Sequence, residues 1–151
     1  MAQDLEPEYI AVSRNSRFAW AVMQEANALA VIDIKRAKVL HILALGAKDH
    51  SLPGNGIDAS NRDGAINITN WPVKGMYQPD AIAFFRTEEQ SYLISANEGD
   101  ARDYDGFSEE ERVKDLPLDP TVFPDAATLQ QDEKLGRLNS TTANGDANGD
   151  G

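Results

Sequence analysis

The sequence predicts a mainly β protein: a β-propeller fragment of antiparallel four-stranded blades, with loop insertions and one or two short helices. Three observations carry this prediction. Segments rich in β-branched and aromatic residues recur about every ten residues in the first third of the chain. The polar connections between them are short enough for hairpins. Part of the pattern returns about 72 residues later, as repeated blades would require.

A first blade is expected within residues 1–45, because four strand-like segments follow one another there. They are residues 8–13, 18–23, 29–34 and 39–45. Together they span about 40 residues, the usual length of one propeller blade. A meander in a sandwich or an open sheet is the alternative that periodicity alone leaves open.

The start of a second blade is expected at residues 78–96, because QPDAIA at residues 78–83 resembles EPEYIA at residues 6–11. Residues 46–77 form an inserted loop between the two blades, rich in Gly, Asn and Asp and without a helical period. A loop of this length usually carries function, although it can also be a cover. Residues 71–73, together with Met76 and Tyr77, are expected to anchor it to the blade face.

The last segment, residues 97–151, is predicted to be an acidic insertion with short helices and a partial calcium-type loop. Ser108 followed by Glu111 resembles a capping box and predicts the start of a helix. Residues 125–135 predict a second short helix, which Gly136 would end. Because the second blade then lacks two strands, we interpret the chain as a fragment or split segment of a larger propeller. Its open sheet edges would pair with the remainder of the propeller or with another copy.

Charge and composition exclude several classes of protein. The chain has 14 basic and 25 acidic residues, and residues 97–151 alone carry 14 acidic against 5 basic ones. This balance argues against a nucleic-acid partner and suits cations. No apolar run approaches the roughly 20 residues of a transmembrane helix, and the N-terminal residues do not resemble a signal peptide. The absence of cysteine excludes disulfides and thiolate metal sites.

Four stretches resemble the choice-of-anchor I family. They read DHSLPGNG at residues 49–56, NWPV at 70–73, GMYQPD at 75–80 and ANEGDARDY at 96–104. The resemblance implies a secreted or surface β-propeller protein, located in the periplasm, outside the cell or on its surface. The family includes atypical alkaline phosphatases and resembles the mesenchyme-specific cell surface glycoprotein. The resemblance therefore leaves open a phosphomonoesterase activity in the full-length protein.

An acidic loop after the second blade's last expected strand is the main candidate metal site. Its carboxylates belong to Glu98, Asp100, Asp103 and Asp105. Four carboxylates within eight residues repel one another unless cations or arginine offset them. Oxygen ligands of this kind suit Ca²⁺ or Mg²⁺. Arg102 could hold a phosphate oxygen beside the metal. The alternative is a solvated acidic turn with Arg102 in an internal ion pair.

A second candidate metal site lies at the C-terminus. Asp146, Asn148 and Asp150 match the opening of a Ca²⁺-binding loop, with oxygen ligands at positions one, three and five. A frayed polar terminus is the alternative.

His50 is a candidate ligand or proton carrier, although a loop histidine is more often structural. Arg102 and His50 are thus the two candidate catalytic residues.

Two functions follow from these features. The first is a non-catalytic binding module with divalent-cation-binding acidic loops. The alternative is a metal-dependent phosphoesterase, in which metal ions clamp a phosphate ester and activate a water molecule.

Overall fold

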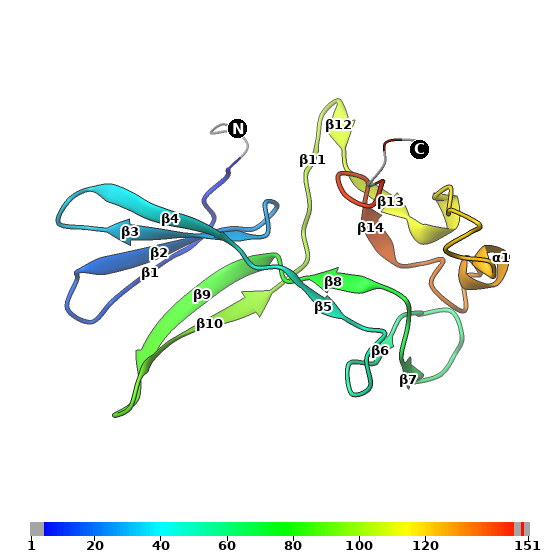
Figure 1. Cartoon of the computed structure of the whole chain (residues 1–151), viewed down its shortest axis with the longest axis horizontal. Helices are drawn as coiled ribbons and strands as arrows, with labels where there is room; N and C mark the ends of the chain where they lie inside the picture. The colour runs from blue at the N-terminus through cyan, green and yellow to red at the C-terminus, as the bar shows by residue number, and fades with distance from the viewer. Residues whose placement is uncertain (1–4, 147–148, 150–151) are drawn as a thin grey trace. The chain divides into compact units, whose positions relative to one another are not determined.

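A computed structural model describes residues 5–146 and 149 and confirms the mainly β class (Figure 1). The chain divides into two compact units. The first unit comprises residues 1–48 and 74–101, and the second comprises residues 49–73 and 102–151. The sheets are antiparallel, which is consistent with a propeller fragment, and the described residues do not close a propeller.

The first unit is built around a four-stranded antiparallel meander. Its strands are β1 (Ile10–Val12), β2 (Phe18–Met23), β3 (Ala28–Asp33) and β4 (Lys38–Ala44), hydrogen-bonded in that order. Each of its three hairpins has the same turn, in which the fourth residue donates to the first residue's carbonyl and takes a positive φ. The donors are Ser16, Asn27 and Ala37, at N···O distances of 2.8, 2.8 and 3.1 Å. These short polar turns are the connections that the sequence predicted.

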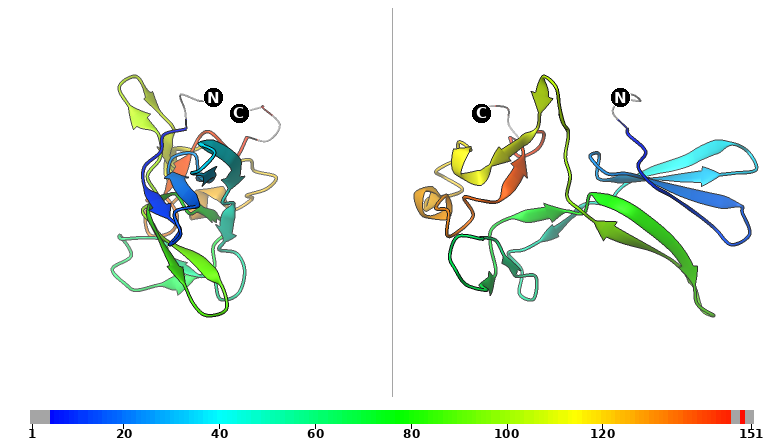
Figure 2. Two further views of the ribbon diagram at one scale, coloured as in Figure 1. Left: turned by 90° about the vertical axis from the view of Figure 1, so that its left-hand side faces the viewer. Right: turned by 180° about the vertical axis from the view of Figure 1, so that it is seen from behind.

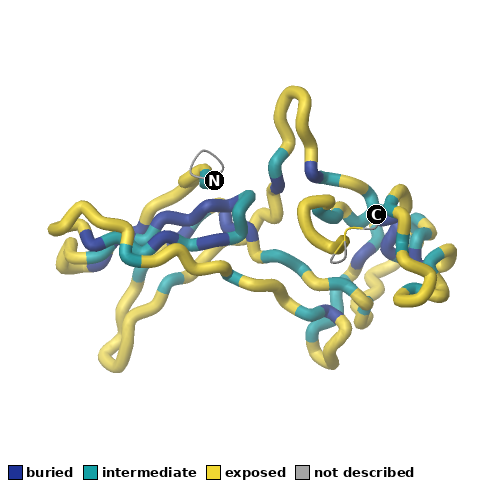
Figure 3. The backbone as a smooth tube through the Cα atoms, turned by 45° about the horizontal axis from the view of Figure 1, so that its top comes forward, coloured by how far each residue is buried: buried dark blue, intermediate teal, exposed yellow. Residues whose placement is uncertain are grey.

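A second hairpin packs on this meander within the same unit. It consists of β9 (Pro79–Arg86) and β10 (Ser91–Asn97), which form a curved ribbon in Figure 2. Val22, which is fully buried, clusters with Ala11 on β1 and Ile82 on β9. Trp20 stacks on Phe84 with ring centroids 5.3 Å apart. Two antiparallel sheets therefore meet face to face through apolar side chains, and Figure 3 shows the buried residues concentrated in β2 and β3.

Two short strands join the units along the chain. β5 (Ala47–Asp49) leaves the meander and pairs with β8 (Lys74–Met76), which returns to it.

The second unit contains shorter elements. They are β6 (Ile57–Asp58), β7 (Ile68–Thr69), β11 (Asp103–Tyr104), β12 (Phe107–Ser108), β13 (Glu110–Arg112), a 3₁₀ turn at Val113–Asp115, α1 (Ala126–Leu129) and β14 (Asn139–Thr141). β6 pairs with β7, β11 with β12, and β13 with β14. The last pair joins residues 27 to 31 positions apart, since Arg112 lies opposite Asn139 and Glu110 opposite Thr141.

The inserted loop and the C-terminal segment share one apolar core. Leu135, which is 2% exposed, clusters with Ala59, Val113 and Leu129. Trp71 and Val73 pack against this cluster. The expectation that the loop is anchored to the blade face is therefore wrong for Trp71 and Val73. They belong to the second unit, because its apolar side chains offer them a larger buried surface than a loop could supply alone. Met76 and Tyr77 do lie in the first unit, where the Tyr77 N–H donates to Asn27 Oδ1 at 3.1 Å.

The helix predicted at Ser108 is also absent. Residues 107–112 form β12 and β13 instead, and the second predicted helix shrinks to the four residues of α1. The backbone carbonyl of Glu109 accepts the Thr142 N–H at 2.7 Å, and its own N–H donates to Arg102 O at 3.0 Å. These non-local bonds satisfy the backbone N–H and C=O groups of Glu109 in an extended conformation, and burial of its side chain adds to the stability of that conformation. A capping box without an apolar helical stripe does not outweigh them.

Candidate functional site

The chain passes from the first unit to the second within the acidic loop that the sequence marked as a metal site. Glu98 and Asp100 belong to the first unit, and Asp103 and Asp105 belong to the second. Glu98 Oε2 accepts a hydrogen bond from Gln24 Nε2 at 3.1 Å. Asp100 Oδ1 accepts one from the Ala101 N–H at 3.1 Å.

Asp103 and Asp105 lie on the β11–β12 hairpin and are exposed. Asp103 lies opposite Ser108 in the strand pair. Asp105 occupies the turn beside Gly106, whose φ of +88° favours glycine. Across residues 5–146 and 149, no group of three or more His, Asp or Glu side chains is gathered closely enough to hold a metal ion. The structure thus places these four carboxylates without assembling them into one centre.

Arg102 forms a buried ion pair with Glu109 at the base of this hairpin. Arg102 Nη1 lies 3.4 Å from both carboxylate oxygens of Glu109, and the Arg102 backbone N–H donates to Oε1 at 3.1 Å. The Glu109 side chain is 3% exposed and that of Arg102 is 15% exposed. A carboxylate this deeply buried needs a charged partner, and Arg102 supplies it. An internal ion pair for Arg102 is one of the two alternatives that the sequence predicts, although the pattern at residues 108–111 predicts a helix around Glu109.

His50 is a buried link within the inserted loop. Its Nδ1–H donates to the carbonyl oxygen of Asn55 at 2.7 Å, since a carbonyl oxygen can only accept. Its backbone N–H donates to Val73 O at 3.0 Å, and its carbonyl oxygen accepts the Trp71 N–H at 3.2 Å and Asn70 Nδ2 at 2.9 Å. The residue thus joins the two ends of the loop.

The C-terminal candidate site is described only in part. Asp146 Oδ1 accepts the Gly149 N–H at 2.8 Å. Asn148 and Asp150 lie outside the described residues.

Glu25 is a charged feature of the first unit that the sequence analysis missed. It lies in the β2–β3 turn, where burial raises the pKa of its carboxyl. Repulsion from Glu6, Glu8 and Asp100 raises this pKa further, although a backbone hydrogen bond partly offsets the rise. Because these acids are distant in sequence, only the folded meander reveals their mutual influence. The end of the first unit that carries Asp100 is therefore a region of negative potential.

Replacing Glu25 with glutamine is expected to stabilise the protein at neutral pH. A raised pKa in the folded state means that ionisation of Glu25 opposes folding above that pKa, and the penalty disappears below the ordinary value of 4.5. Thermal melting of Glu25→Gln and of the unmodified protein between about pH 4 and pH 7 measures how the difference in their stability depends on pH. The melting temperatures should converge at the acidic end. Glu88→Gln, at an exposed position, is the control, and equal shifts in both variants would contradict the assignment.

A polar pocket in the second unit was also missed. It brings together residues 58–61 after β6 with Arg112 and Arg137. Nothing in the local sequence pairs these segments, because Ser60 and Arg137 are 77 positions apart.

Comparisons with known proteins identify the family. Searches of curated proteins and of solved structures give no match. Within the described residues, no helix combines the length and the apolar character needed to cross a membrane. The family model described as the choice-of-anchor I domain matches residues 1–151. Members of this family are cell-surface or secreted proteins with β-rich domains. Since the match spans the whole chain, the protein belongs to the choice-of-anchor I family.

Proposed function

We propose that the chain is a non-catalytic binding segment of a secreted or cell-surface β protein, and that its acidic loops bind divalent cations. The ion pair between Arg102 and Glu109 is the observation that supports a non-catalytic role. This arginine, which would have to stabilise the charge of a phosphate ester, faces a buried glutamate instead. His50, the other candidate, has its Nδ1–H committed to a backbone carbonyl. Both residues therefore hold loops in place.

The cation-binding half is supported by charge and exposure. Glu98, Asp100, Asp103 and Asp105 are exposed, and repulsion from Asp100 contributes to the raised pKa of Glu25. A divalent cation would offset this repulsion, since hard cations take several carboxylate oxygens. Within the described residues, no three acids lie close enough together to hold a metal ion, so the proposal rests on the charge and exposure of these carboxylates.

We expect the melting temperature to rise as Ca²⁺ is added. A cation that binds only the folded protein stabilises it by mass action, by about 2.7 kcal/mol at 100 times its dissociation constant. The test compares the unmodified protein with a variant in which the four loop acids are replaced by their amides. Glu88, Glu89, Asp115 and Asp125, all exposed, provide a control with four matched replacements elsewhere. The Ca²⁺ response should fall in the loop variant and persist in the control.

A melting curve that is identical with Ca²⁺ and with a chelator would contradict the cation-binding half. A response that falls equally in both variants would show general charge screening instead of loop binding. The phosphoesterase alternative stays a prediction. It would require Arg102 to leave Glu109 buried without its charge partner.

A further inference from the structure

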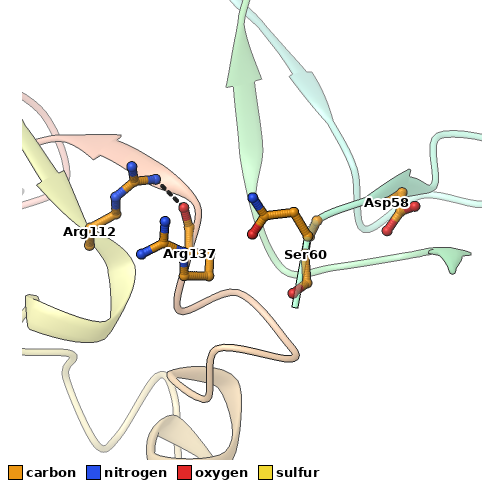
Figure 4. A pocket seen from close by; sticks show the side chains of 6 residues that line it. Asp58, Ser60, Arg112 and Arg137 are labelled. Carbon is orange, nitrogen blue, oxygen red and sulfur yellow. Dashed lines mark hydrogen bonds between the residues drawn. The ribbon is translucent and has the colours of Figure 1, made fainter. Parts of the chain in front are cut away.

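The pocket of the second unit has a volume of about 400 Å³ (Figure 4). Arg112, on β13, and Arg137, shortly before β14, approach it from one side. Asp58 and Ser60 approach it from the β6 side, and Ala59 and Asn61 complete the lining. None of these residues belongs to the acidic loop or to the candidate catalytic pair.

The two arginines are held in place by the backbone around them. Arg112 Nη1 donates a hydrogen bond to the backbone carbonyl oxygen of Arg137. Gly136 lies against the preceding turn so tightly that a Cβ there would be 2.3 Å from Gln130 O, which fixes the chain just before Arg137. Ser60 Oγ donates to Asp132 O at 2.5 Å and ties the opposite wall to the same turn. The pocket is therefore preorganised.

Neither arginine has an acidic partner among the described residues. Arg112 and Arg137 are both half-buried, yet no carboxylate oxygen of the described chain lies within 4.0 Å of either guanidinium. Glu110, two positions before Arg112 on β13, accepts a hydrogen bond from Asn139 Nδ2 at 3.1 Å instead. Arg137 Nε is buried without an acceptor. This is unexpected in a segment with 14 acidic and 5 basic residues.

Two half-buried positive charges at one pocket repel each other, and unused N–H donors add to the unfavourable energy. A bound oxyanion would remove both problems, because guanidinium groups donate charge-assisted hydrogen bonds to oxygen anions in a fixed planar geometry. We propose that this pocket binds a small oxyanion, with Arg112 and Arg137 as its charged contacts and the Asn61 amide as a neutral donor. The proposal is independent of the cation-binding loops and involves no turnover.

Asp58 sets the preference among oxyanions. Asp58 lines the pocket, and its carboxylate oxygens are more than 4.0 Å from either guanidinium, so it adds an acceptor to an otherwise positive site. A fully ionised anion meets repulsion there. An oxyanion that retains a hydroxyl can donate to Asp58 and contact the arginines at the same time. Inorganic phosphate keeps at least one proton near neutral pH and sulfate does not, so phosphate is expected to bind more tightly.

Calorimetric titration of the protein with phosphate, sulfate and acetate at low ionic strength tests the proposal. Arg137→Gln should weaken phosphate binding about tenfold or more, because charged hydrogen bonds are lost. Arg62→Gln, an equal charge change at an exposed position outside the pocket lining, should leave it nearly unchanged. Asp58→Asn should reduce the difference in binding affinity between phosphate and sulfate. Equal loss in the two arginine variants would reduce the binding to non-specific charge attraction and overturn the proposal.

A second readout needs no variant. The arginine Nε–H resonances of the unmodified protein should shift saturably with phosphate at two positions, Arg112 and Arg137. Tighter binding of acetate would assign the pocket to carboxylate ligands and overturn the role of Asp58. Absence of both heat and resonance shifts would overturn oxyanion binding altogether, whatever the stability of the variants.

Discussion

Replacement of Arg102 by leucine should destabilise the second unit by about 3–5 kcal/mol. The substitution leaves the Glu109 carboxylate, which is 3% exposed, inside the protein without its cation. Removing one partner of a buried ion pair costs far more than the pair contributes in net terms, because the remaining charge stays desolvated. Urea denaturation followed by circular dichroism measures the change.

Two comparisons make this result diagnostic. In Arg102→Leu/Glu109→Leu the buried charge is gone, so much of the lost stability should return. Lys114→Leu removes an ion pair with Asp132 whose side chains are 36% and 44% exposed, and it should cost less than about 1 kcal/mol. If Arg102→Leu were as mild as Lys114→Leu, the ion pair would not hold the hairpin.

Replacement of Leu135 by alanine should destabilise the second unit by about 2–5 kcal/mol. Leu135 is 2% exposed and contacts a cluster that both chain segments of the unit supply. The lost methyl groups leave a cavity that the backbone around Gly136, in contact with Gln130 and Gln131, has little room to close. Fluorescence of Trp71 in a Trp20→Phe background reports the unfolding of this unit alone, because Trp71 packs against the same cluster.

Leu52→Ala is the matched control, because Leu52 lies in the inserted loop and is 52% exposed. This substitution should change the free energy of unfolding by less than about 0.5 kcal/mol. Equal effects of the two substitutions would show that the inserted loop and the C-terminal segment do not share a core.

The meander was the most predictable part of the fold. Strands of alternating or β-branched residues separated by four-residue polar turns leave few other ways to satisfy the backbone, and β2 lies at the predicted residues 18–23. The second unit was less predictable because its contacts are non-local. Glu111 contributed to a helix signal in sequence, yet it pairs with Ser140 in a strand. Local strand and helix propensities carry no information about a pairing partner 29 positions away.

The candidate sites follow the same division. The acids at residues 98–105 could be found from sequence because they are close along the chain. The Arg102–Glu109 pair could have been predicted from sequence, since only seven positions separate the two residues. The helix predicted at Ser108 argued against it, because it placed Glu109 in the helix instead of opposite Arg102. The Arg112–Arg137 pocket could not be found, because it depends on the register between β13 and β14 and on the turn before Gly136.

Hydrolysis of a simple phosphomonoester is the measurement that tests the non-catalytic assignment most directly. The rate is measured with Ca²⁺, with Mg²⁺ and with chelator, for the unmodified protein and for Arg102→Lys, which keeps the charge opposite Glu109. With Arg102 committed to Glu109, neither protein should exceed a metal-only control under any condition. Metal-dependent turnover by the unmodified protein that Arg102→Lys abolishes, while both remain folded, would make Arg102 a catalytic residue and contradict the account.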